Sequence, residues 1–438
     1  MIEPVPWLRD SRWPTVPIKY VARLGTGHTP SRQKPEYWVA CDVPWITLAD
    51  VWQLRDGRTH VIQDTAEKIS ALGLANSSAV RHPAGSVILS RTASVGFSAI
   101  MGADMATSQD FAVWTCGPQI VPEFLLHVLR AMEPDLKRLA AGTTHQTIYM
   151  PDLGALRTPL PTVPEQLLIA ALLGAETAWI DSLSGHLDAV ADAIQERRLG
   201  QVWAHVTGAA SASKSAAPRL AWAPELPSTW PVVKVNFVAR QGSGHTPSRS
   251  QPDWWKDCHI PWITTGEVQQ VRDDRREVLI ETRESISDLG LANSSAELHP
   301  AGTVVLCRTA ASAGYSAVMG TDMATSQDFA TWTCGPRLDP YYLLWCLRAM
   351  RPDLLGRLAM GSTHKTIYMP DIQTIRIPLP TREEQRAIVA EIRADNERLD
   401  VLLDRIDRQR LLLAERRQAV ITAAVTGQLD VPTIRGAA

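Results

Sequence analysis

The sequence predicts a mixed α/β (α+β) globular domain that occurs twice in one chain, with a long helix after each copy. Three observations indicate this organisation. Segments of the first half recur in the second half at a nearly constant offset. Within each copy, short apolar runs alternate with turns and short helical patterns. After each copy, apolar residues follow a heptad-like spacing over about 40 residues, which is typical of a coiled-coil helix.

The duplication is visible in segments of identical or nearly identical sequence. PWIT at 44–47 recurs at 261–264, an offset of 217 residues. TIYMPD at 147–152 recurs at 366–371, an offset of 219 residues. Such a period is far longer than the repeat of a solenoid protein, so the pattern indicates duplication of a whole domain.

Each copy begins with a globular part, which we place at residues 1–160 and 230–380. SVILS at 86–90 is typical of a buried strand. Pro122 stands at the start of an apolar helical pattern over 123–132, which is a favoured position for proline. The mixture of short strands and short helices predicts two similar globules.

The long helices are predicted at residues 161–208 and 381–427, with an Ala-, Ser- and Pro-rich linker at 209–229 and a tail at 428–438. Two such helices, each about 60 Å long, can pair as an antiparallel coiled coil, which would relate the two globules by a pseudo-two-fold axis. The alternative is that each helix packs on its own globule. The predicted coiled-coil core residues are Ile169, Leu173, Ile180, Leu183, Leu187 and Ile194 in the first helix, and Ile388, Ile392, Leu399, Leu402, Ile406 and Leu413 in the second.

Composition and motifs exclude several classes of protein. The formal net charge is −2, no run of 18 or more apolar residues occurs, and the N-terminus lacks a secretory pattern, which predicts a cytoplasmic protein without a membrane span. The six cysteines form no CxxC pair, which indicates reduced thiols. No GK[ST], intact [DN]PP[YF] or zinc-ligand spacing is present. The sequence therefore predicts no catalytic residue, no metal site and no cofactor in this chain.

Polar loops that are alike in both copies are the candidates for binding nucleic acid. GTGHTPSR at 25–32 recurs as GSGHTPSR at 242–249, and each ends in an arginine suited to a phosphate. The alternative is that these loops are only tight turns. In the other loops, an arginine can donate hydrogen bonds to guanine, and a glutamine can form hydrogen bonds with adenine. The alternative is that these side chains only stabilise a turn through hydrogen bonds. The candidate DNA-binding residues are Arg32, Arg91, Thr92, Gln109, His145 and Gln146 in the first copy, and Arg249, Arg308, Thr309, Gln327, His364 and Lys365 in the second.

The order of these motifs resembles the specificity subunit of Type I restriction–modification systems. The resemblance rests on TPSR, PWIT and the TIYMPD–PLPT–EQ segment that leads into each long helix, and it covers both copies. It implies two target-recognition domains, each followed by one helix of a central antiparallel coiled coil. It also implies a non-catalytic subunit in which each domain reads one half of a bipartite double-stranded DNA target.

The same resemblance implies the partners of the chain. They are two modification subunits, which bind the methyl donor S-adenosylmethionine, and restriction subunits in the full complex. Because the two copies are so alike, we expect a nearly palindromic target. The specificity subunit of a Type IIB-like system is an alternative that the sequence does not distinguish. A lone adenine-N6 methyltransferase with fused recognition domains is less favoured, because it would need a methyl-donor site and an intact [DN]PP[YF], and the sequence shows neither. A purely structural coiled-coil scaffold is disfavoured by the large duplicated globules with polar loops.

Overall fold

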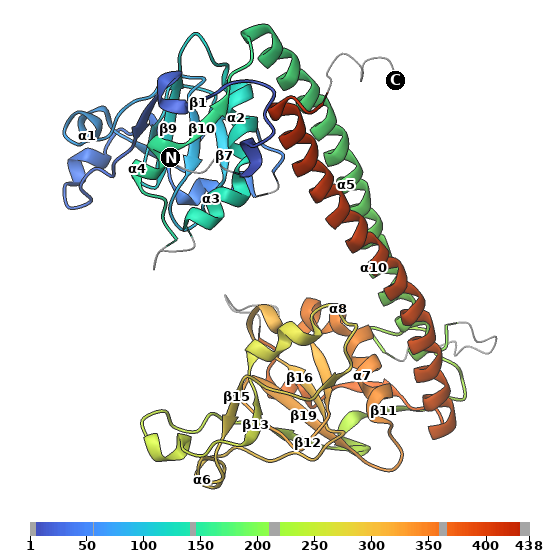
Figure 1. Cartoon of the computed structure of the whole chain (residues 1–438). Coiled ribbons are helices and arrows are strands. Elements are labelled where there is room, and N and C mark those ends of the chain that lie inside the picture. The colour runs from blue at the N-terminus through green and yellow to red at the C-terminus, as the bar shows by residue number, and fades with distance from the viewer. Residues whose placement is uncertain (1–5, 56, 141–145, 210–219, 359–365, 430–438) are drawn as a thin grey trace. The chain divides into compact units, whose positions relative to one another are not determined.

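The computed structural model of the chain describes residues 6–55, 57–140, 146–209, 220–358 and 366–429. These residues form two compact units, each of which takes segments from both halves of the chain (Figure 1). Unit 1 comprises Met1–Asp188 with Asp407–Ala438, and unit 2 comprises Ala189–Ile406. Each unit therefore contains one globular domain together with parts of both long helices.

The globular domain of unit 1 combines three small sheets with short helices. Within the described residues, the five-stranded sheet has the order β2-β9-β6-β7-β4, the three-stranded sheet β5-β3-β8 and the two-stranded sheet β1-β10. The strands are β1 Thr15–Pro17, β2 Ala22–Thr26, β3 Val43–Ile46, β4 Val61–Ile62, β5 Glu67–Ile69, β6 Val87–Ser90, β7 Ser98–Met101, β8 Ala106–Thr107, β9 Phe111–Cys116 and β10 Arg157–Pro159. The α-helices are α1 Ala71–Ala75, α2 Pro122–Ala131, α3 Glu133–Ala140 and α4 Met150–Ala155.

The globular domain of unit 2 repeats this topology. Within its described residues, the sheets have the orders β12-β19-β16-β17-β14, β15-β13-β18 and β11-β20. The strands are β11 Val232–Lys234, β12 Ala239–Ser243, β13 Ile260–Ile263, β14 Val278–Leu279, β15 Glu284–Ile286, β16 Val304–Cys307, β17 Ser316–Met319, β18 Ala324–Thr325, β19 Phe329–Cys334 and β20 Arg376–Pro378. The α-helices are α6 Asp288–Ala292, α7 Pro340–Ala349, α8 Arg351–Asp353 and α9 Met369–Ile372. The matching orders confirm the predicted duplication of one α+β domain.

Both faces of each five-stranded sheet are covered. In unit 1, Val87 and Leu89 of β6 lie in a core with residues of α2, whereas Ile88 between them lies in a second core with Ile46 of β3. All four side chains are fully buried. Successive side chains of a strand point to opposite faces, so an uninterrupted apolar run such as VIL is expected where both faces are covered. β16 repeats this alternation in unit 2.

Both long helices begin at the same motif. α5 spans Val163–Thr207 and α10 spans Arg382–Thr426. Before α5, the hydroxyl and the backbone N–H of Thr162 both donate to the carboxylate of Glu165 at 2.7 Å. This is the glutamate half of a capping box, and the equivalent residues repeat it before α10.

A buried glutamine ties the start of each long helix to its globular domain. Gln166 Nε2 donates to the carbonyls of Gln119 at 2.8 Å and Pro161 at 2.9 Å, and Oε1 accepts from the N–H of Val121 at 2.9 Å. Gln385 makes the three equivalent bonds in unit 2. The PLPT–EQ segment therefore fixes the direction in which each long helix leaves its domain.

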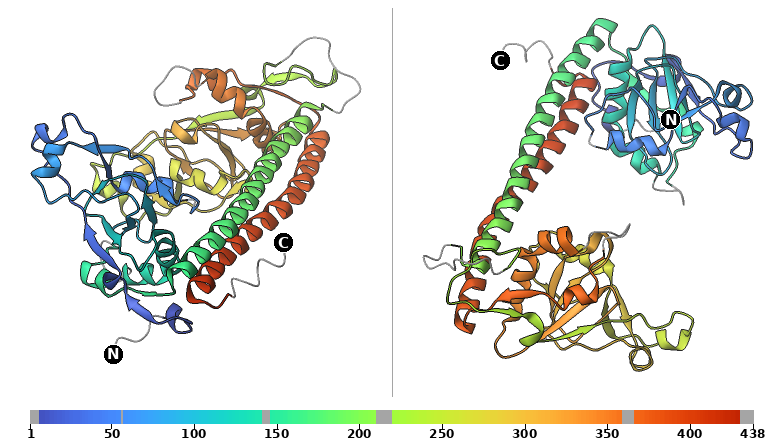
Figure 2. Two further views of the ribbon diagram at one scale, coloured as in Figure 1. Left: turned by 90° about the horizontal axis from the view of Figure 1, so that it is seen from above. Right: turned by 180° about the vertical axis from the view of Figure 1, so that it is seen from behind.

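In each unit the segments of α5 and α10 run side by side in opposite directions (Figure 2). In unit 1, Glu176 of α5 pairs with Arg416 of α10 at 3.8 Å. Further along α5, Asp188 pairs at 2.6 Å with Arg410, which precedes Arg416 on α10. The ion pairs of unit 2 follow the same direction. Antiparallel pairing is therefore present in both units.

Each long helix also packs on the globular domain of the other copy. Val202 and Val206, near the end of α5, lie in the main core of unit 2. Ile421 and Val425, near the end of α10, lie in the main core of unit 1. The alternative in which each helix packs only on its own globule is therefore wrong.

The seam between the helices differs from the prediction at two positions. Leu183 and Leu402 are exposed to 36% and 43%, whereas Leu403 is exposed to only 5%. The prediction considered only apolar residues, whereas the side of α10 that faces α5 also includes the partly buried Arg410 and Arg417. When both are counted, the seam positions of α10 follow one another in strict steps of three and four residues, and this series passes through 403 and not 402. Of the other predicted core residues, Ile169, Leu173, Ile180, Ile388, Ile392, Leu399, Ile406 and Leu413 are buried, and Leu187 and Ile194 are half-buried.

α5 is long and apolar enough to cross a membrane by composition alone. One 18-residue stretch has a mean hydropathy of 1.4, although only 22% of it is buried. The sequence led us to expect no such segment, because charged and polar residues interrupt every apolar run. In unit 1 the carboxylates Glu176 and Asp181 of α5 pair with arginines of α10. A helix that packs against a partner helix can have the same length and mean hydropathy, so these properties of α5 are a weak indication of a membrane span.

Candidate functional site

The glycine-rich turn packs tightly against a neighbouring strand in both units. In unit 1 the N–H of His28 donates to the carbonyl of Thr107 at 3.0 Å. A Cβ atom at Gly27 would lie 1.8 Å from that carbonyl oxygen, and one at Gly244 would lie 2.0 Å from the equivalent oxygen in unit 2. Only glycine permits this approach. The tight-turn interpretation therefore explains these two glycines.

The arginines that end the turns are engaged within their own domains. Arg32 Nη2 donates to Glu67 at 2.7 Å, and its guanidinium lies 4.2 Å from the ring centroid of Trp38. Arg249 makes the equivalent contact with Glu284 at 2.6 Å. Both arginine side chains are about 60% exposed. These ion pairs and ring contacts support a role in holding the turn, and they leave less of each guanidinium for a phosphate than the sequence suggested.

Three loops converge on one exposed glutamine in unit 1. Arg91 Nε donates to the backbone carbonyl of Gln109 at 3.0 Å, and Arg91 Nη1 donates to that of Ile148 at 3.1 Å. The hydroxyl of Thr29 donates to the amide oxygen of Gln109 at 2.7 Å. We call Thr29, Arg91 and Gln109 the loop cluster of unit 1.

The loop cluster recurs in unit 2 as Thr246, Arg308 and Gln327. Arg308 Nε donates to the carbonyl of Gln327 at 2.9 Å, and the hydroxyl of Thr246 donates to its amide oxygen at 2.6 Å. Both glutamines are exposed. The sequence prediction did not include Thr29 and Thr246 among the candidate residues, although both lie in the GHTP segment that is identical in the two copies.

The remaining candidates border the loop cluster. Thr92 pairs with Thr147 in an isolated β-bridge, as Thr309 does with Thr366 in unit 2. Gln146 is exposed and has a φ of 41°. A positive φ is uncommon for a residue other than glycine, and such strain often accompanies a functional contact. His145, His364 and Lys365 lie outside the described residues.

In unit 2 a second polar region lies where the globular domain meets α10. Arg393 of α10 makes a forked contact with the carboxylate of Glu277, with Nη2 to Oε2 at 2.6 Å and Nε to Oε1 at 3.1 Å. Trp345 Nε1 of α7 also donates to Glu277, at 3.1 Å. Glu277 therefore links the body of the domain to the long helix.

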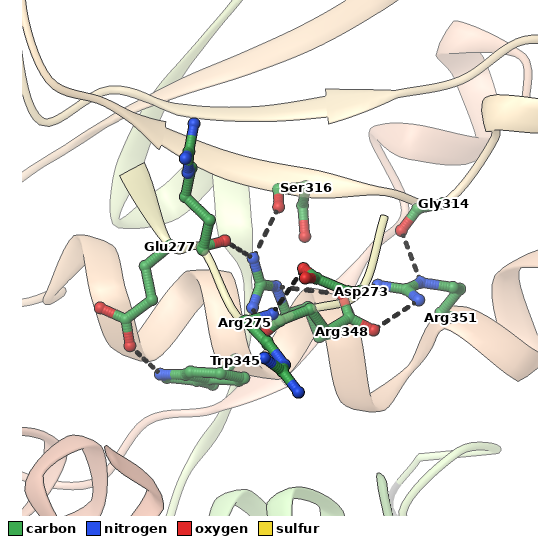
Figure 3. Close-up of polar contacts among 10 residues, drawn as sticks. Asp273, Arg275, Glu277, Gly314, Ser316, Trp345, Arg348 and Arg351 are labelled. Atoms are coloured by element: carbon green, nitrogen blue, oxygen red, sulfur yellow. Dashed lines mark hydrogen bonds and ion pairs between the residues drawn. The ribbon is translucent and has the colours of Figure 1, made fainter. Parts of the chain in front are cut away.

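A fully buried arginine holds the loop that carries Glu277 (Figure 3). Arg348 of α7 donates to the carbonyls of Asp274 at 2.7 Å, Arg276 at 2.6 Å and Ser316 at 3.2 Å. The Asp274 carboxylate accepts from both Nη atoms of Arg351, at 2.6 and 2.8 Å. Burial lowers the pKa of Arg348 to about 10, an effect that Asp274 opposes, so the guanidinium stays charged at neutral pH.

Unit 1 replaces the Glu277–Trp345 contact by two histidines. His60 and His127 occupy the equivalent positions, with ring centroids 5.6 Å apart. Burial and the positive charge of Arg130 lower the pKa of His60 to about 4 and that of His127 to about 3. Both imidazoles are therefore neutral at neutral pH, and unit 1 lacks the carboxylate that contacts the long helix in unit 2.

The chemistry of the loop cluster is that of hydrogen bonding. It offers hydroxyl, amide and guanidinium groups, which suit base edges and phosphates. Among the described residues, no group of three or more His, Cys, Asp or Glu side chains is placed to hold a metal ion.

Comparison with known proteins gives a family match for both halves of the chain. The family described as Type I restriction modification DNA specificity domain matches residues 10–189 and 227–394. The Type I restriction enzyme MjaIX specificity subunit of Methanocaldococcus jannaschii is 21% identical and covers 96% of this chain and 94% of its own length. The EcoR124I/EcoR124II specificity subunit of Escherichia coli is 26% identical over 34% of this chain and 36% of its own length.

A solved structure is similar in fold to most of this chain. It is described as the structural basis of complex assembly and conformational transition of the type I R-M system. It matches with a TM-score of 0.61 at 20% identity and covers 95% of this chain and 98% of its own.

Proposed function

Because the chain belongs to the Type I restriction–modification DNA specificity family, we propose that each of its globular domains reads one half of a bipartite DNA target. We call the globular domains of units 1 and 2 recognition domains 1 and 2. The observation that carries this proposal is the loop cluster, which recurs with the same contacts in both domains. Two equal reading sites joined by paired helices suit a target made of two similar half-sites.

The loop cluster supports a specific reading of one base in each half-site. The hydroxyls of Thr29 and Thr246 donate to the amide oxygens of Gln109 and Gln327, and among the described residues neither amide nitrogen donates to another group. In the bidentate contact with adenine, the amide oxygen accepts from N6 and the amide nitrogen donates to N7. The amide oxygen keeps a second lone pair beside the one that accepts from threonine, and the free N–H donors suit an acceptor, which is N7 of adenine or guanine, O6 of guanine or O4 of thymine. The expectation from sequence that glutamine reads adenine stays a prediction.

The proposed partners are those of the resembled complexes. The chain would bind two modification subunits, which carry S-adenosylmethionine, and restriction subunits in the full complex. It would itself supply no catalytic group and act in the cytoplasm. The near identity of the two loop clusters supports a nearly palindromic target, since equal domains related by an antiparallel pairing read equal bases on opposite strands.

The proposed base contact is tested by replacing each glutamine with alanine in a separate variant. With the cognate modification subunits, Gln109→Ala is expected to lower methylation of the native target by about 10- to 100-fold, because it removes a base contact. It should also relax the choice at one position of the first half-site, and Gln327→Ala should relax the choice only in the second. Methylation rates on DNAs varied at each position give both readouts, and each variant is the control for the other.

If both variants altered both half-sites alike, the glutamines would not be the reading residues. If the wild-type complex methylated DNA without sequence preference, the proposed function itself would be contradicted.

A further inference from the structure

Two aspartates at equivalent positions each lie between two arginines. In unit 2, Asp400 of α10 forms an ion pair with Nε of Arg275 in recognition domain 2 at 3.2 Å and accepts a hydrogen bond from Nη2 of Arg198 on α5. Arg275 Nη1 also donates to Asp404 of α10 at 2.6 Å. The bridge therefore joins three parts: the domain, its own long helix and the opposite helix. We call Arg275, Asp400 and Arg198 brace 2.

Unit 1 contains the same arrangement. Asp181 of α5 pairs with Arg417 on α10 and lies 3.8 Å from Nε of Arg58 in recognition domain 1. We call Arg58, Asp181 and Arg417 brace 1. Each of its residues aligns with a residue of brace 2 in the duplicated sequence, at an offset of 217 or 219. The braces were not visible in the apolar pattern, because two of their arginines occupy seam positions.

The burial of the seam arginines makes their aspartates indispensable. Arg198 is only 1% exposed and Arg417 18%. Among the described residues, Nε and Nη1 of Arg198 have no hydrogen-bond partner. Among the described residues, Asp400 is the carboxylate that pairs with Arg198, and its removal would leave this buried charge uncompensated, which is strongly unfavourable. A polar seam residue also fixes the register of paired helices.

The braces add directional polar contacts where each domain meets the helices. The surrounding contacts of α5 and α10 with the domains are largely apolar, and apolar burial is not directional. Charge-assisted hydrogen bonds of arginine have a fixed geometry, and in each brace such a bond between the helices holds the aspartate that the arginine of the domain pairs with. In brace 1, Arg417 Nη1 also donates to the carbonyl of Gly57 at 2.9 Å, next to Arg58.

We propose that Asp181 and Asp400 are positioning residues that fix the orientation of each recognition domain on the paired helices, and thereby restrict the gap between half-sites that the complex accepts. The proposal rests on the proposed function. It extends that function by assigning gap selectivity to two carboxylates in addition to helix length.

The two braces are not equally supported. In unit 2, the forked contact between Glu277 and Arg393 is a second ionic link between domain and helix. The equivalent residues in unit 1 are the neutral His60 and Gly174, which form no such link. Unit 1 has a neutral link instead, in which Gln418 Nε2 of α10 donates to the carbonyls of Ala131 at 2.9 Å and Arg130 at 3.3 Å. Because a charge-assisted forked contact is stronger than neutral hydrogen bonds, recognition domain 1 depends more on its aspartate, and Asp181→Asn should have the larger effect.

The experiment measures methylation by the reconstituted complex on DNAs with native half-sites and gaps from two base pairs shorter to two longer. Wild type should prefer one gap. Asp181→Asn should reduce the preference for the native gap over its neighbours by at least about tenfold, Asp400→Asn should reduce it less, and Asp181→Glu should restore part of it. Arg58 is the exposed member of brace 1, with 41% of its side chain accessible. Arg58→Gln should therefore broaden the range of accepted gaps while Asp181 stays paired with Arg417 between the helices.

Asp407→Asn is the matched control, because Asp407 on α10 pairs with Arg410 at 3.0 Å and is 63% exposed. Its gap profile should equal that of wild type. An equal fall in rate at every gap in Asp181→Asn and Arg58→Gln, with an unchanged profile, would overturn the proposal and leave the braces a purely structural role. A wild-type complex indifferent to the gap would overturn both this inference and the bipartite reading on which it rests.

Discussion

Replacing Arg348 with methionine is expected to lower the free energy of unfolding of unit 2 by about 3–5 kcal/mol, the usual cost of removing one partner from a buried ionic group. Three carbonyls lose their donor, and the Asp274 carboxylate keeps only Arg351. Asp274 has a φ of 58°, a left-handed conformation that these contacts maintain. The loop that carries Arg275 and Glu277 should therefore loosen.

Native-state hydrogen exchange of the β17 amides measures this loss directly, because Ser316 at the start of β17 is one of the three acceptors. Arg398→Met is the control, since Arg398 is 79% exposed and should change stability by less than about 0.5 kcal/mol. A loss below about 1 kcal/mol in Arg348→Met would show that the buried guanidinium does not hold the loop.

Inserting one heptad into each long helix is expected to lengthen the accepted gap and leave the half-site bases unchanged. The boundaries of the compact units, after Asp188 in α5 and after Ile406 in α10, are the natural points of insertion. Seven helical residues add about 10.5 Å, which corresponds to about three base pairs. Three additional base pairs also rotate one half-site about the DNA axis by about 100° relative to the other. The methylation rate of the lengthened complex at its new gap should therefore be lower than the rate of wild type at the native gap.

Sequencing of DNA methylated by the lengthened complex gives both the gap and the bases. Methylation of the original target should fall at least about 100-fold. An insertion in α5 alone is the control, because it breaks the register with α10 and should abolish methylation at every gap. Altered half-site bases at an unchanged gap would contradict the role of the helices as a spacer.

The fold could be predicted from sequence wherever one local signal sufficed. The duplicated motifs predicted two equal domains, and the observed strand orders agree. The threonine and glutamate of PLPT–EQ marked the starts of both long helices. Gly174, Gly185 and Gly200 do not interrupt α5, because packing against α10 and both domains outweighs a cost of about 1 kcal/mol for each glycine.

The parts that sequence did not predict depend on pairs of residues far apart in the chain. Arg198 and Arg417 occupy seam positions because an aspartate of the opposite helix faces each of them. A search for apolar residues at heptad spacing passes over them and selects Leu402. The ion pair of Arg32 was not predicted, because its partner Glu67 lies 35 residues away, and the contact of Arg32 with DNA stays a prediction. The same spacing separates Arg249 from Glu284, and comparison of the two copies could have revealed the pair.

Two equal recognition domains should read two half-sites that are held at a fixed gap. Single-molecule sequencing of DNA methylated by the wild-type chain with its modification subunits tests this most directly. We expect one bipartite motif: two short half-sites, a gap of fixed length and free sequence, and bases shared between the half-sites on opposite strands, including the base read by Gln109 and Gln327. A continuous motif, or two half-sites with no bases in common on opposite strands, would contradict it.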